Sequence, residues 1–501
     1  MSTPRYRNPI IDGDVPDPDA IRVGDRYYLV ASSFNRSPGL PVLVSDDLVN
    51  WELASHALAG SVPTAWFAQP RHGGGVWAPS IRHHAGHFHV VYPDPDQDVF
   101  VVSAIDARGP WSAPRLLLPG LGVIDPCPLW DEDGRTWLVH GWARSRAGRK
   151  NVLSIAEVDA GLTRVLGPSR DVIDGAVIEG CTTLEGPKIY RRDGWYWIFA
   201  PAGGVATGWQ SVFRSPTIHG PYEHRVVLAQ GSTPVNGPHQ GGWVEGPGGT
   251  HWFLHFQDRG VFGRVLHLQP MAWGDDGWPV MGEAVAGGPA QPVVEHPTPF
   301  GTAQGSRSLA RSDDFAEGRP GGQWAWQANA EADWLADAEH ALVIEAGVDA
   351  GNLRTLPRVI GQPLPGMASA ASVTVALDGP EGSRAGIGVL GLDYLWAGVR
   401  RGAAGGRLVV ALRHRDDASE TVVRDEALGD AVRITLRTSE SADIAVSVDT
   451  GEGERTVLTG FRASEGQWIG AEYVLFAGTG AGQAARGRFE AFEIALADGG
   501  R

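Results

Sequence analysis

A short strand pair joined by a polar turn recurs five times across residues 8–282, and this repeat restricts the folds open to the chain. In the clearest copy, a strand over 188–190 is followed by a turn that ends in Asp193-Gly194 and by an aromatic strand over 195–199. Asp-Gly between two strand-like runs is a strong hairpin signal. The other copies have their strand pairs over 20–30, 80–92, 128–139 and 242–255.

Each copy continues into further strands, which in the first copy are expected over 42–44 and 48–51. Five such units at a spacing of about 40–60 residues are typical of a β-propeller. No amphipathic helical period of useful length interrupts them. The sequence therefore predicts an all-β, five-bladed β-propeller, with an irregular β-sandwich as the alternative.

A Gly/Pro-rich stretch between Val285 and Gly305 separates the repeats from a second set of alternating strands. Regular short strands with Gly and Asp turns favour an antiparallel β-sandwich. We expect a propeller over residues 1–295, a linker over 296–310 and a β-sandwich accessory domain over 311–501.

Composition excludes several classes of function. The 501 residues carry a net charge of −16, whereas a nucleic-acid partner would call for a basic face. Cys127 and Cys181 are the only cysteines and make neither a disulfide framework nor a zinc site. No apolar run is long enough to span a membrane, and the first residues lack the apolar segment of a secretory signal, so a cytoplasmic location is expected.

Three acids precede three of the predicted blades: Asp17 before the first, Asp125 before the third and Glu185 before the fourth. Innermost strands begin near one end of a propeller's channel, so these acids can converge on one funnel. Taken singly, each acid is a common turn residue, and Asp19 competes with Asp17 for the same role. Three carboxyl groups together suit glycoside hydrolysis, in which one activates water, one protonates the leaving oxygen and one tunes the pKa of the acid.

Several motifs together make the chain resemble glycoside hydrolase family 43, of the β-xylosidase and α-L-arabinofuranosidase type. These are Pro16-Asp17-Pro18, Gly24-Asp25-Arg26-Tyr27-Tyr28, Ser45-Asp46-Asp47-Leu48-Val49-Asn50-Trp51, Gly75-Val76-Trp77-Ala78-Pro79, Ile124-Asp125-Pro126 and Glu185-Gly186-Pro187. The second half is similar to the lectin-like (concanavalin A-like) β-sandwich of such enzymes, which packs on the propeller and can lend a loop that closes the pocket. Its likeness lies in Phe315, in 323–327 and in 468–471.

The resemblance implies Asp17 as general base, Glu185 as general acid and Asp125 as the residue that tunes and orients the acid. It also implies inversion at the anomeric carbon, with Asp17 and Glu185 about 6.5–9.5 Å apart.

Four further positions match the family with less force. Phe34 and Trp77 match aromatic residues that wall the sugar subsite, and Arg264 matches an arginine that reaches substrate hydroxyls. His239 matches a histidine near a calcium or other ion in the channel, although the chemistry itself requires no cofactor.

The leading hypothesis is an exo-acting, inverting glycosidase that releases terminal α-L-arabinofuranose or β-D-xylose from plant-type oligosaccharides. The alternatives are a non-catalytic carbohydrate-binding propeller and an endo-arabinanase. The expected partner is an arabinose- or xylose-containing oligosaccharide, not a nucleic acid or a membrane. The oligomeric state is open, and a homo-oligomer is one outcome.

Overall fold

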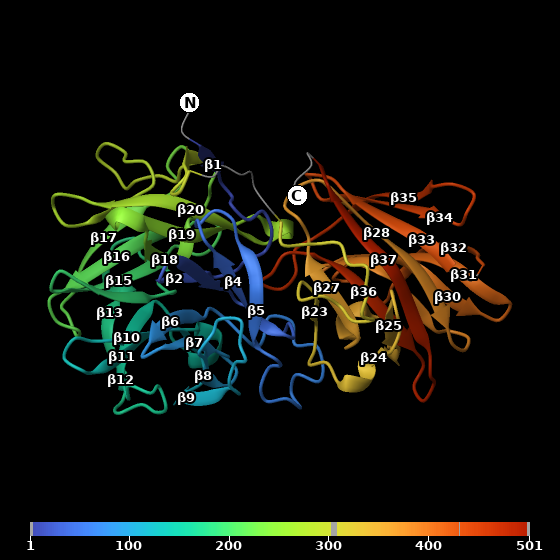
Figure 1. Ribbon diagram of the computed structural model, residues 1–501, viewed down its shortest axis with the longest axis horizontal. Helices are drawn as coiled ribbons and strands as arrows, with labels where there is room; N and C mark the ends of the chain where they lie inside the picture. Colours follow the sequence, from blue (N-terminus) through green and yellow to red (C-terminus); the bar gives the residue numbers. More distant parts are fainter. Residues whose placement is uncertain (1–3, 302–307, 430, 498–501) are drawn as a thin grey trace.

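The computed structural model describes residues 4–301, 308–429 and 431–497 as two β-domains that lie side by side (Figure 1). Part of the expected linker, residues 302–307, is outside these described residues. The helices in the described ranges are short: α1 (Arg144–Ala147), η1 (Gly175–Val177), η2 (Pro247–Gly249), η3 (Gly260–Phe262), η4 (Ala332–Trp334) and η5 (Leu353–Thr355). None of them is long or apolar enough to cross a membrane.

The first domain is the predicted five-bladed β-propeller, in which each blade is a sheet of four consecutive antiparallel strands. Blade I holds β2 (Asp19–Val23), β3 (Arg26–Val30), β4 (Gly39–Ser45) and β5 (Glu52–Leu58), and blade II holds β6 (Ser80–His84), β7 (His87–Pro93), β8 (Asp98–Ala104) and β9 (Arg115–Pro119). Blade III holds β10 (Val123–Trp130), β11 (Thr136–Trp142), β12 (Val152–Val158) and β13 (Arg170–Asp174). Blade IV holds β14 (Lys188–Arg192), β15 (Trp195–Ala202), β16 (Trp209–Ser215) and β17 (Glu223–Leu228), and blade V holds β18 (His239–Glu245), β19 (His251–Asp258), β20 (Arg264–Trp273) and β21 (Pro279–Met281).

The inner hairpins follow the turn chemistry of the sequence. In blade IV, Arg192 pairs with Trp195 across a two-residue loop. Both loop residues have positive φ, 50° at Asp193 and 81° at Gly194, as in the tight turns whose twist matches that of the flanking strands. The predicted hairpin is confirmed here.

The strand expected over 48–51 is wrong, because this segment is the turn between β4 and β5. The carboxylate of Asp47 accepts hydrogen bonds from the backbone N–H groups of Val49, at 2.9 Å, and Asn50, at 2.7 Å, and so holds the chain in a turn. The segment resembles a strand in sequence because Leu48, Val49 and Trp51 are all buried, although they lie in a turn. The Trp51 indole N–H donates to the Leu48 carbonyl. The fourth strand is β5, which begins one residue later.

The N-terminal segment closes the propeller ring against blade V. Strand β1 (Arg5–Arg7) pairs with β22 (Glu295–Pro297), a strand that follows the last blade. The chain then runs beside β20, where the Ile10 N–H donates to the Leu266 carbonyl and the Val15 N–H to the Arg264 carbonyl, both at 2.8 Å. The residues just before Asp17 are thereby fixed to the fifth blade.

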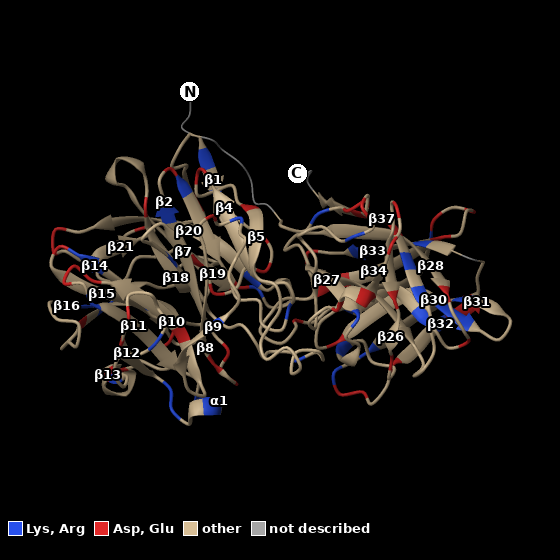
Figure 2. Cartoon of the chain, turned by 60° about the horizontal axis from the view of Figure 1, so that its bottom comes forward, with Lys and Arg blue, Asp and Glu red and all other residues tan. Residues whose placement is uncertain are grey.

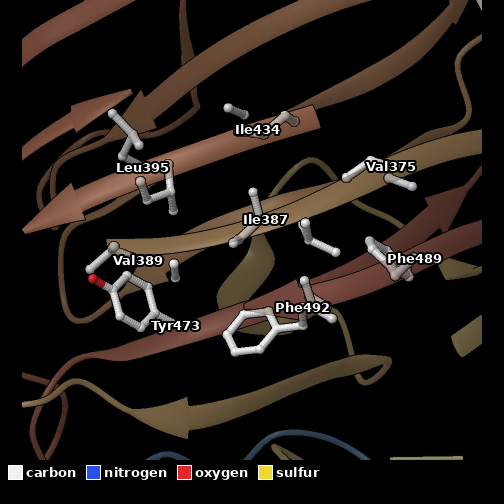
Figure 3. Packing of buried hydrophobic residues seen from close by; sticks show 14 of the residues in the cluster. Val375, Ile387, Val389, Leu395, Ile434, Tyr473, Phe489 and Phe492 are labelled. Carbon is white, nitrogen blue, oxygen red and sulfur yellow. The ribbon is translucent and has the colours of Figure 1, made fainter. Parts of the chain in front are cut away.

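The second domain is a β-sandwich of two large antiparallel sheets. One sheet has the order β23 (Ala325–Trp326), β27 (Val359–Pro363), β36 (Glu472–Thr479), β29 (Arg384–Leu390), β30 (Tyr394–Gly402), β31 (Gly405–Arg413) and β32 (Thr421–Ala427), with β26 (Gly347–Val348) parallel to β36. The other has the order β24 (Leu335–Ala336), β25 (Leu342–Glu345), β37 (Arg486–Leu496), β28 (Ser369–Asp378), β33 (Ala431–Thr438), β34 (Asp443–Asp449) and β35 (Arg455–Arg462). The alternating inward residues of both sheets, among them Val375, Ile387 and Phe489, pack into one core between them (Figure 3).

Charged residues of both signs are interspersed over the two domains (Figure 2). On the sandwich they form cross-strand pairs such as Arg400 with Asp425, at 2.6 Å. Pairing of this kind on a solvated sheet face contributes little to stability, but it keeps the face polar.

The two domains share an extensive and specific boundary. Ser37 of the propeller forms a β-bridge with Trp326 of the sandwich, and the Asn35 amide donates to the Gln327 carbonyl at 2.6 Å. Phe262, in η3 of the propeller, is 4% exposed and belongs to the hydrophobic core of the sandwich. Because a propeller side chain completes the sandwich core, the domains form a fixed unit rather than two tethered bodies.

Candidate active site

The three predicted acids line a single cavity of about 280 Å³ at the end of the propeller that faces the sandwich loops. Its walls are formed by Asp17, Phe34, Trp77, Ala78, Ile124, Asp125, Thr183, Glu185, Gly204, Val205, Gln240, Arg264 and Trp468. All six residues predicted for catalysis or sugar binding are in this set, although they are spread along the chain from the segment before β2 to the start of β20. The seventh predicted residue, His239, is not among the lining residues.

Asp17 is held by donors on both of its carboxylate oxygens. The Ser32 hydroxyl donates to Oδ2 at 2.6 Å, and an Arg264 Nη1–H donates to Oδ1 at 2.7 Å. The residue has φ 54°, a left-handed conformation that is uncommon outside glycine and that occurs often at functional sites. Both carboxylate oxygens of Asp17 are thus held in fixed positions beside the cavity.

Asp19 is excluded from the site by its own contacts. Its side chain is completely buried, and Oδ2 accepts from the Ile81 N–H at 2.9 Å and from Arg82 Nη1 at 2.6 Å. These partners belong to blade II, so Asp19 joins two blades. Of the two acids, Asp17 is among the residues that line the cavity and Asp19 is not.

A β-bulge turns Asp125 into the cavity. The pairing of β10 with β11 shifts register between Ile124 and Cys127, and Asp125 within the shift has φ 56°. Bulges commonly re-aim a side chain in this way beside active sites. The Asp125 carboxylate accepts the Gly186 N–H at 2.7 Å, so it contacts the backbone immediately after Glu185.

Glu185 has a strongly perturbed carboxyl group. Burial, followed by the negative charges of Asp125 and Asp17, raises its pKa to about 8. Burial and the charge of Asp17 also raise the pKa of Asp125, to about 6, while the Gly186 N–H opposes the rise. At neutral pH the pair therefore carries its proton mainly on Glu185, which suits a proton donor to a leaving oxygen.

The aromatic wall has two members from the propeller and one from the sandwich. The Phe34 and Trp77 rings meet edge to face, with centroids 6.5 Å apart, and the Trp468 ring stands 6.2 Å from Trp77. Trp77 is fixed by its indole N–H, which donates to the Gly73 carbonyl at 2.9 Å, and by the guanidinium of Arg146, 5.3 Å from its ring centroid. Flat apolar faces beside carboxyl groups are suited to one sugar ring.

Trp468, Gln240 and Ser32 are site residues that the sequence reasoning missed. Trp468 lies in the loop before β36, more than 340 residues after Asp125, and its aromatic character alone gives no reason to place it at the propeller. Its φ of 66° was also not visible in the sequence. Gln240 lies at a register shift of β18 with φ 41°.

His239 is fully buried next to the acid, with its Nε2 atom 3.5 Å from Glu185 Oε1. Burial, followed by the positive charge of Arg264, lowers its pKa to about 3, so the ring is neutral. Neither ring nitrogen has a hydrogen-bond partner in the described chain, and no cluster of three or more His, Cys, Asp or Glu among the described residues could hold a metal. One imidazole does not fit an ion that needs several protein ligands.

Both domains match families of known proteins. Residues 6–279 match the model described as glycosyl hydrolases family 43, and residues 312–495 match the one described as the beta xylosidase C-terminal concanavalin A-like domain. A protein named "Putative beta-xylosidase" from Xylanibacter ruminicola is 38% identical over 377 residues, which cover 75% of this chain and 69% of that protein.

Two further comparisons agree with these matches. A non-reducing end alpha-L-arabinofuranosidase from Bacteroides ovatus is 32% identical over 296 residues, which cover 56% of this chain and 54% of that protein. The fold is that of a xylan beta-1,4-xylosidase from Bacillus halodurans, with a TM-score of 0.84 at 22% identity over 98% of this chain and 99% of that one. The chain belongs to glycoside hydrolase family 43 and is a glycosidase that carries the concanavalin A-like domain of the β-xylosidase type.

Proposed function

We propose that the protein is an exo-acting, inverting glycosidase that removes terminal β-D-xylose or α-L-arabinofuranose from oligosaccharides. The observation that carries this proposal is the cavity in which Asp17, Asp125 and Glu185 meet under an aromatic wall supplied by both domains. The names of the relatives, a beta-xylosidase and an alpha-L-arabinofuranosidase, support a pentose as the released sugar.

In this mechanism Glu185 gives its proton to the glycosidic oxygen as the bond to the anomeric carbon breaks. Asp17 removes a proton from a water molecule that attacks the anomeric carbon from the opposite face. Inversion requires room for that water, so we expect the carboxyl groups of Asp17 and Glu185 to be about 6.5–9.5 Å apart. Asp125 acts through Glu185, because its negative charge favours the protonated acid.

The shape of the cavity supports removal of single residues from chain ends. Trp468 reaches over the propeller cavity from the sandwich, so the site has a wall where an endo-acting enzyme would need an open cleft. An endo-arabinanase is therefore less favoured. A pocket of this kind buries most of one sugar ring, and both pentoses offer similar hydroxyl geometry to it.

The proposed chemistry uses protein groups alone. Asp17, Glu185 and water account for every proton that moves, and no step passes through an ion. His239 is the residue that an ion in the channel would meet, with water as its remaining ligands. We propose that such an ion, if bound, has a supporting role in the channel.

The proposal is tested with p-nitrophenyl β-D-xyloside and p-nitrophenyl α-L-arabinofuranoside, comparing the wild type with Glu185→Ala. We expect the wild type to cleave at least one of them. The nitrophenolate leaves without much help from an acid, so the variant should lose less activity on the aryl pentosides than on xylobiose or arabinobiose. On these disaccharides we expect a loss of about 100-fold or more. NMR of the sugar released first should show the inverted anomer.

Inactivity of the wild type on both aryl glycosides and on xylo- and arabino-oligosaccharides would overturn the proposal. Binding of those oligosaccharides without cleavage would then favour a carbohydrate-binding propeller. Release of oligosaccharides from linear arabinan, without monosaccharide, would instead favour the endo-arabinanase.

A further inference from the structure

Asp14 lies three residues before Asp17 and receives hydrogen bonds from both domains. Its Oδ1 atom accepts the backbone N–H of Arg264 in the propeller at 2.7 Å, and its Oδ2 atom accepts the backbone N–H of Gly470 in the sandwich at 3.0 Å. The two oxygens of one carboxylate thus join two chain segments that each bring a side chain to the cavity.

On the propeller side, Asp14 and its neighbour hold both polar backbone groups of Arg264. The Arg264 N–H donates to Asp14, and the Arg264 carbonyl accepts the Val15 N–H at 2.8 Å. The guanidinium of Arg264 then donates to Asp17 Oδ1 at 2.7 Å. The position of the proposed base therefore depends on a backbone that Asp14 fixes.

On the sandwich side, Gly470 follows Trp468 by two residues, and the next N–H, of Ala471, donates to the Val261 carbonyl at 2.8 Å. The segments are in such close contact that side chains are excluded. A Cβ atom on Gly470 would be 2.7 Å from the Gly263 nitrogen, and one on Gly263 would be 2.2 Å from Asp14 Oδ1.

The carboxyl group of Asp14 is buried, which disfavours its charged form. Burial raises its pKa to about 6, even though the two backbone donors and Arg264 oppose the rise. A carboxylate at such a place needs its hydrogen bonds, because a buried charge without partners is strongly destabilising. The hydrogen bond from Gly470 to Asp14 therefore holds the loop that carries Trp468 in one position against the propeller.

We propose that Asp14 is a positioning residue that couples the Trp468 loop of the sandwich to Arg264 and, through Arg264, to Asp17. The sandwich thereby sets the cavity wall and the orientation of the base together. The kinetic consequences of this coupling rest on the proposed function, whereas the coupling itself can be measured without any substrate.

The test is Asp14→Asn, which keeps the size and shape of the side chain but offers only one acceptor oxygen, so one backbone N–H loses its partner. The matched control is Asp12→Asn. Asp12 is also at the domain boundary, accepting Arg259 Nη1 at 2.7 Å and contacting Gly366, but it touches neither Arg264 nor Gly470.

We expect Asp14→Asn to reduce kcat/KM on the aryl pentosides by about 10–100-fold, with KM raised and kcat lowered, since misplacement of a site by a fraction of an ångström has effects of this size. Asp12→Asn should stay within about 3-fold of the wild type. In a cycle with Trp468→Ala, the double variant should lose less than the product of the single losses, because both act through one loop.

Hydrogen exchange gives the readout that is independent of activity. We expect the amides of residues 466–471 to exchange about 10-fold faster in Asp14→Asn than in the wild type or Asp12→Asn. If Asp14→Asn is not recovered folded, Asp14→Ser takes its place in both experiments. Unchanged exchange in this loop, or equal kinetic losses in the Asp14 and Asp12 variants, would overturn the proposal. Faster exchange in Asp14→Asn, together with a wild type that cleaves no pentoside, would retain the coupling and reject the proposed function.

Discussion

The three acids of the cavity have the same functional group and different surroundings. Asp17 has donors on both oxygens, and Asp125 has the Gly186 N–H, whereas no hydrogen bond to the Glu185 carboxyl occurs within the described chain. Donors favour the charged form of a carboxyl group, while burial without donors favours the neutral form. The differences in surroundings thus match the division between a base, a tuning charge and an acid.

Asp125→Asn should move the basic limb of the pH profile. The proposed acid works when protonated, so kcat/KM falls as pH rises through the pKa of Glu185, about 8. Removing the charge of Asp125 removes the second-largest cause of that raised pKa, so the fall should begin at lower pH. The measurement is kcat/KM over a range from about pH 4 to about pH 10, which spans both the ordinary pKa of a glutamic acid and the raised pKa of Glu185.

Glu185→Gln is the control for this profile, because a variant without the acid should show no basic limb from that group. A basic limb that stays in place in Asp125→Asn would contradict the assigned electrostatic role.

At the residue scale, local motifs were enough to bring six predicted residues to one cavity. Each of Asp17, Asp125 and Glu185 lies next to a proline or a Gly-Pro pair at the start of an inner strand, so a repeat argument reaches them. Trp468 was out of reach because it comes from the other domain, and nothing in the repeat records which sandwich loop meets the propeller. The backbone angles that aim Asp17 and Asp125 were equally invisible.

Among the elements, inner and outer strands differed in how readily they could be predicted. Inner hairpins carry clear turn signals and alternating apolar residues. The outermost strands β9, β13 and β17 have exposed, charged residues at one end, as in Arg115–Pro119, and give no periodic pattern. In the sandwich, β36 and most of β30 are buried on both faces, so their sequences lack the alternation that marks a half-exposed strand.

The short helix η3 is the element that joins catalysis to domain packing. It carries Phe262 into the sandwich core and ends there, two residues before Arg264. Phe262→Ala should therefore reduce the free energy of unfolding by about 3–5 kcal/mol, the usual effect of removing a buried Phe ring. It should also lower kcat/KM, because the backbone of Arg264 loses its anchor.

Urea unfolding and pentoside kinetics on the same preparation measure both effects of Phe262→Ala. Asp12→Asn again serves as the boundary control. A stability loss with unchanged kcat/KM would show that η3 does not position Arg264.

On the scale of the whole molecule, the shared core makes two domains behave as one. Phe262 is buried in the sandwich, Asp14 binds Gly470, and a buried ion pair joins Arg36 to Glu472 across the boundary. The two side chains are 8% and 7% exposed, and this burial lowers the pKa of Arg36 to about 9. Separation of the domains would expose this charge pair and an aromatic ring together.

Calorimetry of the full chain should accordingly give a single unfolding transition. A chain of residues 1–301 should be inactive and should unfold at a lower temperature, since it lacks Trp468 and exposes Phe262. Two resolved transitions, or pentosidase activity in the propeller alone, would contradict the picture of one cooperative unit.

The position of β37 has a consequence for how the enzyme is made. This strand, Arg486–Leu496, pairs with β25 and β28 near the middle of its sheet, so the sandwich cannot close before it leaves the ribosome. Domains generally fold as they emerge, the first one earlier. The propeller with all three acids is thus translated long before its Trp468 wall and the partner of Asp14 are in place. A nascent chain therefore holds all three acids while the site is still unfinished, and the cavity is completed only when the second domain has emerged and folded.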